Sequence, residues 1–341
     1  MHIKNVLWAV ASATAVRRAQ GSAVEADFLG GPKISQSQLD SLKFYAQHAG
    51  AAYCNFNTRT GQPITCRANA CPSVEANDVK VIDSVVGVVT GVGAYVAVDK
   101  KRREIVMSVR GSNNIRNFVT DVVFAQEPCH FVAGCKIHTG FNKGWNEIQS
   151  VATRAVHTAH KENPSFRIIA TGHSLGAAVT TLGAAYLRQD GLPVEIYSYG
   201  SPRIGNTAFA GWMTVQKGIH MRVTHFDDPV PRVPPIILGY NHISPEYWLS
   251  GGGPLREDYS ADQIRTCLGL ANTLCNGGTL GFDVLAHLHY LGNTAGCTGN
   301  PLLLKRGDSD WLNETLEERF NRWSVSDRKF AANMTQNAGW E

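Results

Sequence analysis

The chain has 341 residues, a formal net charge of +4 and a charged fraction of 18%. Basic runs with interleaved aromatic residues do not occur in it, so a nucleic-acid partner is not expected. Its length would allow about two domains. However, no Pro/Ser-rich linker and no internal repeat divides it, which favours one catalytic domain with processed ends.

The N-terminus has the pattern of a secretory signal. A cationic MHIKN precedes the apolar stretch VLWAVASATAV, residues 6–16, which is too short to span a bilayer. Arg17 and Arg18 form a dibasic pair suited to removal of a short pro-segment. We therefore predict that residues 1–27 are a signal peptide with a short pro-segment and that the protein is secreted and extracellular. A buried N-terminal helix is the alternative.

Eight cysteines, an even number, agree with an oxidising compartment. Proximity in the chain pairs six of them in short loops and leaves two distant ones to meet. The resulting pairs are Cys66–Cys71, Cys129–Cys135, Cys267–Cys275 and Cys54–Cys297. Metal ligation by cysteine is not expected, because no CxxC pair exists.

Strand-like and helix-like segments alternate along the chain. Helices are predicted at residues 38–52, 145–160, 175–189 and 206–215, and strands at 84–89, 94–98, 104–109, 166–171, 194–199 and 220–225. Apolar strands alternating with helices predict an α/β fold with a mostly parallel central sheet and helices on both faces. Catalytic loops should lie at the carboxyl ends of its strands.

The stretch TGHSLGAA, residues 171–178, places Ser174 at the centre of a GxSxG motif. A lone GxSxG is common in glycine-rich turns. Here the motif lies between a predicted buried strand and a predicted helix, where Gly172 and Gly176 would allow strand and helix to cross closely. This context favours a nucleophilic serine.

A serine hydroxyl needs a histidine to accept its proton, and that histidine needs a carboxylate. In α/β-hydrolases the chain order is Ser, Asp, His. Asp227 and Asp228 follow the strand at 220–225, although Asp before Pro is also a common turn former. Near the end of the domain, AHLHYLG offers His287 and His289, and a metal pair formed by these two would lack a third ligand nearby.

Several separated motifs resemble those of the fungal class 3 lipases over about residues 35–297. Besides TGHSLGAA they are VRGSNNIRNFVTD (109–121), HTGF (138–141), YGSPRIGN (199–206), THFDDPVPRVPP (224–235), HISPEYW (242–248) and AHLHYLG (286–292). The resemblance implies an α/β-hydrolase fold with a short helical lid. It also implies carboxylic ester hydrolysis through an acyl-enzyme, with no metal and no organic cofactor.

By position, the resemblance makes Ser174 the nucleophile, Asp228 the acid and His287 the base. The oxyanion hole would be the backbone N–H of Leu175 together with the N–H and hydroxyl of Ser112. The resemblance also implies three of the four disulfides. The pair Cys267–Cys275 is not part of that pattern, and it could border the substrate groove or act as a surface staple.

The lid is expected within residues 113–120. If this segment is helical, Ile115, Phe118 and Val119 share one apolar face of the helix. The polar residues of the segment, Asn114, Arg116, Asn117 and Thr120, then lie mostly on its other faces. The predicted lid residues are Asn114, Ile115, Arg116, Asn117, Phe118 and Val119. Phe118 stands where many relatives carry tryptophan. This segment favours a tri-, di- or monoacylglycerol substrate at a lipid–water interface, with only transient binding to the lipid surface.

Two alternatives remain: an esterase for feruloyl or other soluble esters with the same fold, and a non-catalytic lipid-binding protein. We expect a monomer.

The catalytic domain is predicted at residues 28–297. Residues 298–341 are predicted to be a C-terminal extension or propeptide, because they contain the dibasic Lys305–Arg306 and two glycosylation sequons, at Asn313 and Asn333. A helical apolar stripe there consists of Leu312, Leu316, Phe320 and Trp323.

Overall fold

The computed structural model describes residues 31–112, 123–298 and 315–337. The predicted signal peptide and pro-segment at 1–27 and the predicted lid residues Asn114 to Val119 lie outside the described residues. The dibasic Lys305–Arg306 also lies outside them.

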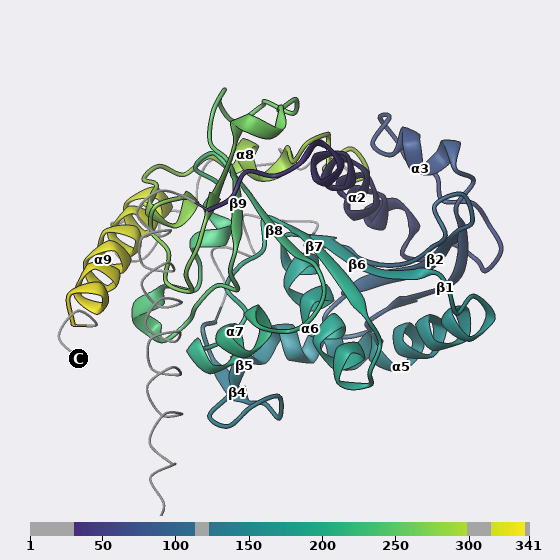
Figure 1. Ribbon diagram of the computed structural model, residues 1–341, viewed down its shortest axis with the longest axis horizontal. Helices are drawn as coiled ribbons and strands as arrows, with labels where there is room; N and C mark the ends of the chain where they lie inside the picture. Colours follow the sequence, from purple (N-terminus) through teal and green to yellow (C-terminus); the bar gives the residue numbers. More distant parts are fainter. Residues whose placement is uncertain (1–30, 113–122, 299–314, 338–341) are drawn as a thin grey trace, which may run out of the picture.

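An eight-stranded sheet forms the centre of the molecule (Figure 1), in the order β1-β2-β3-β6-β7-β8-β9-β10. Neighbouring strands from β3 to β9 are parallel, and β1, β2 and β10 join antiparallel at the two edges. The strands are β1 (Lys80–Val86), β2 (Gly93–Asp99), β3 (Glu104–Val109), β6 (Arg167–His173), β7 (Val194–Tyr199), β8 (His220–His225), β9 (Glu246–Leu249) and β10 (Ile264–Cys267).

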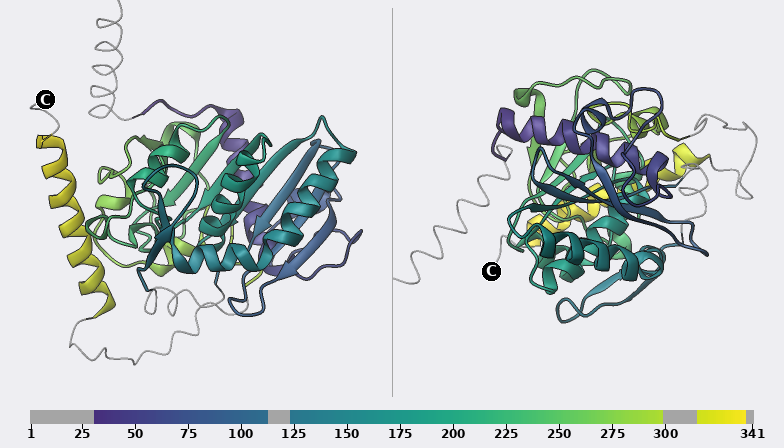
Figure 2. Two further views of the ribbon diagram at one scale, coloured as in Figure 1. Left: turned by 90° about the horizontal axis from the view of Figure 1, so that it is seen from below. Right: turned by 90° about the vertical axis from the view of Figure 1, so that its right-hand side faces the viewer.

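Helices cover both faces of this sheet. Helix α2 (Gln36–Asn55) packs on one face, and α5 (Thr139–Glu162) and α6 (Leu175–Gln189) pack on the other (Figures 1 and 2). The predicted α/β-hydrolase architecture is confirmed. The smaller elements are α3 (Pro72–Ala76), the hairpin β4 (Gln126–Pro128) and β5 (Lys136–His138), α7 (Thr207–Thr214), the 3-10 turns η1 (Val230–Arg232), η2 (Ile236–Leu238), η3 (Ala261–Gln263) and η4 (Asn276–Gly278), and α8 (Val284–Leu288).

Four elements, β3, α6, β7 and β8, have the bounds that the sequence predicts. Helix α5 begins six residues before the predicted start, because the Nδ1 atom of His138 accepts hydrogen bonds from the N–H groups of Gly140 and Phe141 and caps the helix there. Strand β1 was predicted at 84–89 and instead ends at Val86. The chain turns at the next residue, where the N–H of Gly87 donates to the carbonyl oxygen of Val92 at 2.7 Å.

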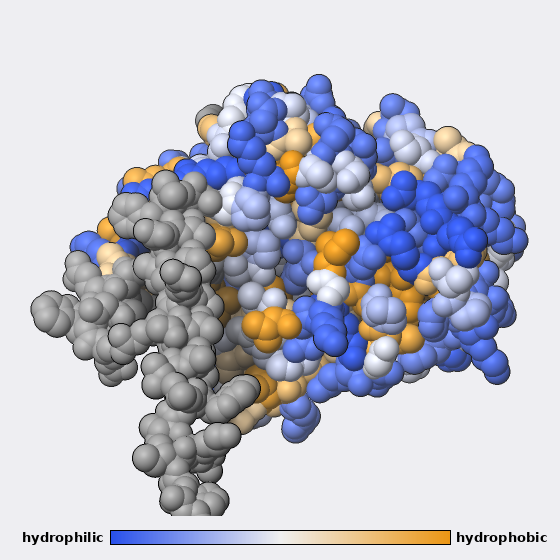
Figure 3. All heavy atoms as spheres, in the orientation of Figure 1, coloured by the Kyte–Doolittle hydropathy of each residue, from blue (hydrophilic) through white to orange (hydrophobic). Residues whose placement is uncertain are grey.

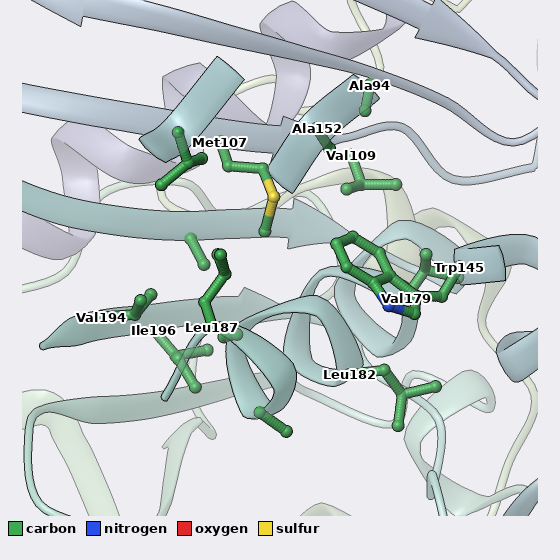
Figure 4. Packing of buried hydrophobic residues seen from close by; sticks show 14 of the residues in the cluster. Ala94, Met107, Val109, Trp145, Ala152, Val179, Leu182, Leu187, Val194 and Ile196 are labelled. Atoms are coloured by element: carbon green, nitrogen blue, oxygen red, sulfur yellow. The ribbon is translucent and has the colours of Figure 1, made fainter. Parts of the chain in front are cut away.

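The core has two layers, one on each face of the sheet. Along β2, Val96 packs on the α5/α6 side, and the neighbouring Tyr95 and Ala97 pack on the α2 side, as strand alternation requires. Figure 4 shows Trp145 of α5 beside Val179 of α6 in the first layer. A Cβ at Gly183 would lie 2.5 Å from the Trp145 ring, so glycine is needed where α5 and α6 meet.

The last described helix, α9 (Leu316–Asn337), lies at the end of the molecule away from β1 (Figures 1 and 2). It packs against the turns η2 and η4. In Figure 3 the end of the molecule near β1 is largely hydrophilic, and apolar side chains form scattered patches elsewhere on the same face. Among the residues described, no helix is both long enough and apolar enough to cross a bilayer.

Candidate active site

Ser174 lies at the corner between β6 and α6. Its backbone has φ 60° and ψ −133°, a conformation that costs a non-glycine residue free energy and persists only where the surrounding structure enforces it. Two close approaches enforce it. A Cβ at Gly172 would lie 2.6 Å from the carbonyl oxygen of Gly176, and a Cβ at Gly176 would overlap the carbonyl oxygen of Val109. The backbone N–H of Ser174 donates to the carbonyl oxygen of Tyr199 on β7 at 2.9 Å.

The structure brings Asp228 and His287 together, although 58 residues separate them in the chain. One carboxylate oxygen of Asp228 accepts from the Nδ1 atom of His287 at 2.7 Å and also from the Tyr290 hydroxyl. The other accepts from the backbone N–H of Val230 at 2.8 Å. Asp228 and His287 are both fully buried. Because a carboxylate cannot donate, Nδ1 carries the proton and Nε2 is left as the acceptor.

Asp227 has a different environment. It is half-buried, burial raises the pKa of its carboxyl group, and its Oδ1 atom has no hydrogen-bond partner in the described part of the chain. It makes no bond to His287. The structure thus supports the choice of Asp228 over Asp227. His289 likewise points elsewhere, with its Nδ1 atom 2.5 Å from the Glu257 carboxylate.

Within the described residues, the Ser174 hydroxyl and the Nε2 atom of His287 are buried and have no hydrogen-bond partner. Gly200 leaves room for the imidazole, since a Cβ there would lie 2.9 Å from the Cε1 atom of His287. A buried hydroxyl and a buried acceptor nitrogen of fixed tautomer are the two groups that nucleophilic acyl transfer requires.

Two further histidines, which the sequence reasoning missed, hold the backbone at His287, the predicted base. His173 binds the carbonyl oxygen of His287 through Nε2 at 2.7 Å and the Tyr53 hydroxyl through Nδ1 at 2.9 Å. His225 binds the carbonyl oxygen of Ala286 through Nδ1 at 2.9 Å. Burial lowers the pKa of both imidazoles, which favours their neutral forms. The available sequence signals were the position of His173 next to Ser174 and that of His225 just before the loop that carries Asp228.

The two predicted oxyanion donors follow β6 and β3. Leu175 is the first residue of α6 and comes directly after Ser174. Ser112 follows Gly111, where a Cβ would lie 2.9 Å from the Cβ of Ser174, so the segment carrying Ser112 runs against the nucleophile. Beside Leu175 opens a largely apolar pocket of about 290 Å³, lined by Val123, Ala125, His138, Thr139, Gly140, Phe141 and Leu175.

All four disulfides have the pairing that the sequence predicts: Cys54–Cys297, Cys66–Cys71, Cys129–Cys135 and Cys267–Cys275. The last of these is buried rather than a surface staple. Asn276, next to Cys275, donates from its side chain to the carbonyl oxygens of Phe226 and Asp228 at 3.1 Å each. The Cys267–Cys275 disulfide therefore secures a loop that supports Asp228, the predicted acid. In the described residues, no cluster of three or more His, Cys, Asp or Glu could hold a metal ion.

Comparisons with known proteins show the family of this chain. The family description "Lipase (class 3)" matches residues 106–238, and "Lipase 3 N-terminal region" matches residues 7–81. The chain is 51% identical to secreted mono- and diacylglycerol lipase 1 of Fusarium solani over 89% of this chain and 90% of that protein. It is 35% identical to secreted mono- and diacylglycerol lipase A of Penicillium cyclopium over 80% of this chain and 91% of that protein.

Among solved structures, the mono- and diacylglycerol lipase of Aspergillus oryzae superposes with a TM-score of 0.73 at 35% identity. The match covers 77% of this chain and 99% of that one. The chain belongs to the class 3 lipase family, as its motifs predicted.

Proposed function

We propose that the protein is a secreted serine lipase that hydrolyses the carboxylic esters of acylglycerols through an acyl-enzyme. The observation that carries the proposal is the Asp228–His287 pair, with an acceptor Nε2, in a fold whose strained elbow presents Ser174. Family membership supports ester hydrolysis, and the names of the Fusarium and Penicillium relatives support secretion and a mono- or diacylglycerol substrate. We expect it to act as a monomer that touches lipid surfaces transiently.

In the first half of the reaction, the Ser174 hydroxyl attacks the ester carbonyl while Nε2 of His287 takes its proton. The N–H of Leu175 and the N–H and hydroxyl of Ser112 stabilise the oxyanion. The partial glyceride or glycerol then leaves with the proton from His287. In the second half, water attacks the acyl-enzyme, gives its proton to His287, and the fatty acid departs as Ser174 recovers its hydrogen.

Covalent labelling by an organophosphonate tests the nucleophile, and hydrolysis of tributyrin, dicaprylin and methyl ferulate tests the substrate class. We expect labelling at Ser174, lost in Ser174→Ala, with dicaprylin and tributyrin cleaved faster than methyl ferulate. Preference for methyl ferulate would identify a feruloyl esterase. Absence of labelling would identify a lipid-binding protein without catalysis.

We further propose that residues 113–120 form a lid that opens at an oil surface. The support is the apolar spacing of Ile115, Phe118 and Val119, since contact of a large apolar side chain with lipid is worth about 1.5–3 kcal/mol. Replacing Ile115 and Phe118 by serine should weaken emulsion hydrolysis much more than hydrolysis of a soluble acetate ester. Equal losses on both substrates, with lower stability, would show that these side chains belong to the core.

A further inference from the structure

We propose that helix α9 is a positioning element of the enzyme. In this proposal Asp327 of α9, through a buried ion pair with Arg203, holds the loop that carries Asp228 (residues 226–235, the acid loop). Helix α9 therefore supports turnover instead of inhibiting it. The proposal rests on the assignment of Asp228 and His287 given above.

Asp327 is the central contact of the helix. Its side chain is only 2% exposed and lies 3.0 Å from the guanidinium of Arg203, which is only 1% exposed. The other carboxylate oxygen of Asp327 accepts from the backbone N–H of Ile236 at 2.8 Å and of Ile237 at 3.3 Å. These two residues begin η2, directly after the acid loop. Both oxygens of this buried carboxylate therefore have polar partners, a cation on one and two backbone N–H donors on the other.

Arg203 transmits this contact to the acid loop. Its Nη1 atom donates to the carbonyl oxygens of Arg232 at 2.7 Å and Pro234 at 2.8 Å. Arg203 itself lies three residues after Gly200, where the chain makes room for the His287 imidazole. Removing the Asp327 charge would take the ion-pair partner at 3.0 Å away from a buried cation, a state that proteins relieve by local rearrangement.

A second set of contacts ties α9 to the same region. The Ser324 hydroxyl accepts from Nη1 of Arg232 at 3.2 Å, and the Asn321 side chain accepts from the N–H of Gly281 at 2.8 Å. Arg232 also donates to the carbonyl oxygens of Thr279 and Gly281. The helix therefore joins the acid loop to the segment that leads into α8, which carries the base.

The apolar face of α9 packs beside α8. Phe320 is 1% exposed and meets Phe282 edge-on, and Trp323 meets Phe124 in the same way. The other members of this cluster are Val230, Val233, Val284, Leu285, Leu288 and Ala295. Leu285 and Leu288 flank His287 in the chain. Since Ser174 Oγ and His287 Nε2 have no hydrogen-bond partner among the described residues, the described part of α9 makes no hydrogen bond to either atom.

The test measures the full-length Asp327→Asn variant on a soluble p-nitrophenyl ester, with active sites counted by organophosphonate titration. A small misplacement of catalytic groups lowers turnover by up to about a hundredfold. We therefore expect kcat to fall about tenfold to a hundredfold, with KM nearly unchanged, and Asp327→Glu to recover part of the loss. Lys329→Ala, an exposed change on the same helix, is the matched control and should match the wild type.

A kcat per titrated site equal to that of the wild type, with only the melting temperature lowered, would overturn the proposal. So would a rise in activity, which an inhibitory cover predicts. If Asp327→Asn does not accumulate as folded protein, Ser324→Ala is measured in the same way, and an unchanged kcat there overturns the proposal. Failure of the wild type itself to be labelled would instead refute the assignment of Ser174.

Cleavage of the folded enzyme at Lys305–Arg306 gives an independent measurement. Gel filtration and mass spectrometry should find the helix still bound, and activity should persist. Release of the helix with activity unchanged or raised would contradict the positioning role and favour a removable propeptide.

Discussion

The proposed nucleophile and its two proposed partners are held in different ways. Ser174 is positioned by its own neighbours in the chain, because Gly172 and Gly176 permit the strained turn and β6 and α6 fix its two ends. Asp228 lies on the loop after β8 and His287 on the short helix α8, and both depend on groups from other elements such as His173, Tyr290 and the α9 helix. A local motif can therefore specify the turn at Ser174, but the Asp228–His287 pair needs the assembled fold.

The largest effect is expected where the reacting atom itself is lost. Ser174→Ala should lower kcat by about 10⁴-fold or more, because no other group supplies the nucleophile. Stability should change little, as the buried hydroxyl has no hydrogen-bond partner among the described residues. Single-turnover kinetics and thermal unfolding together check this. Substantial residual turnover would mean that another nucleophile serves the reaction.

On the acid side, Asp228→Asn should lower kcat by about 10⁴-fold, since an amide cannot stabilise the positive form of His287 and favours the wrong tautomer. Asp227→Asn is the matched control one residue away and should stay within a few-fold of the wild type. Steady-state kinetics on a soluble ester distinguish the two. An inactive Asp227 variant beside an active Asp228 variant would reverse the assignment.

The tight turn at Ser174 depends on its neighbouring glycines, so replacing one of them should lower the stability of the protein. Gly176→Ala should lower the free energy of unfolding by about 3 kcal/mol, because the added methyl group meets the backbone of Val109 and Arg110, which cannot move aside. Gly211→Ala is the control, since the nearest atom to a Cβ there is 3.6 Å away. Urea unfolding measures both, and equal midpoints would show that the turn tolerates the methyl group.

The effect expected to be smallest near neutral pH is a pH dependence. Burial lowers the pKa of His48 from 6.5 to about 3, so the folded state keeps it neutral while the unfolded state takes up a proton below pH 6.5. Its contribution to stability is present above pH 6.5 and is lost as pH falls toward 3, by about 1.4 kcal/mol per pH unit.

His48→Gln should therefore flatten the fall in stability between pH 6.5 and 4.5, as measured by urea unfolding. The exposed His157 provides the control, and His157→Gln should leave the slope unchanged. A slope that is the same in both variants would show that His48 is not held neutral by burial.

Local patterns accounted for much of the central sheet. The elements β3, α6, β7 and β8 agreed with prediction because each is a buried, strongly patterned segment with clear ends. The bounds of α5 and β1 did not, because a histidine cap and a turn at Gly87 decide them. The short strands β9 and β10 were not predicted, since four residues carry too little pattern to distinguish a strand from a loop.

The sequence by itself determined the fold class, the elbow of Ser174 and the pairing of the cysteines, because each rests on spacing within a short stretch or on counting. From residues alone, two aspartates and two histidines stayed open, and only the family resemblance chose between them. The tertiary structure decided that Asp228 and not Asp227 faces His287, and that Asp327 lies against Arg203. The physical reason is that each pair joins a loop to a helix from a distant part of the chain. Whether loop and helix meet depends on how the whole molecule packs, and it leaves no periodic signal in the sequence.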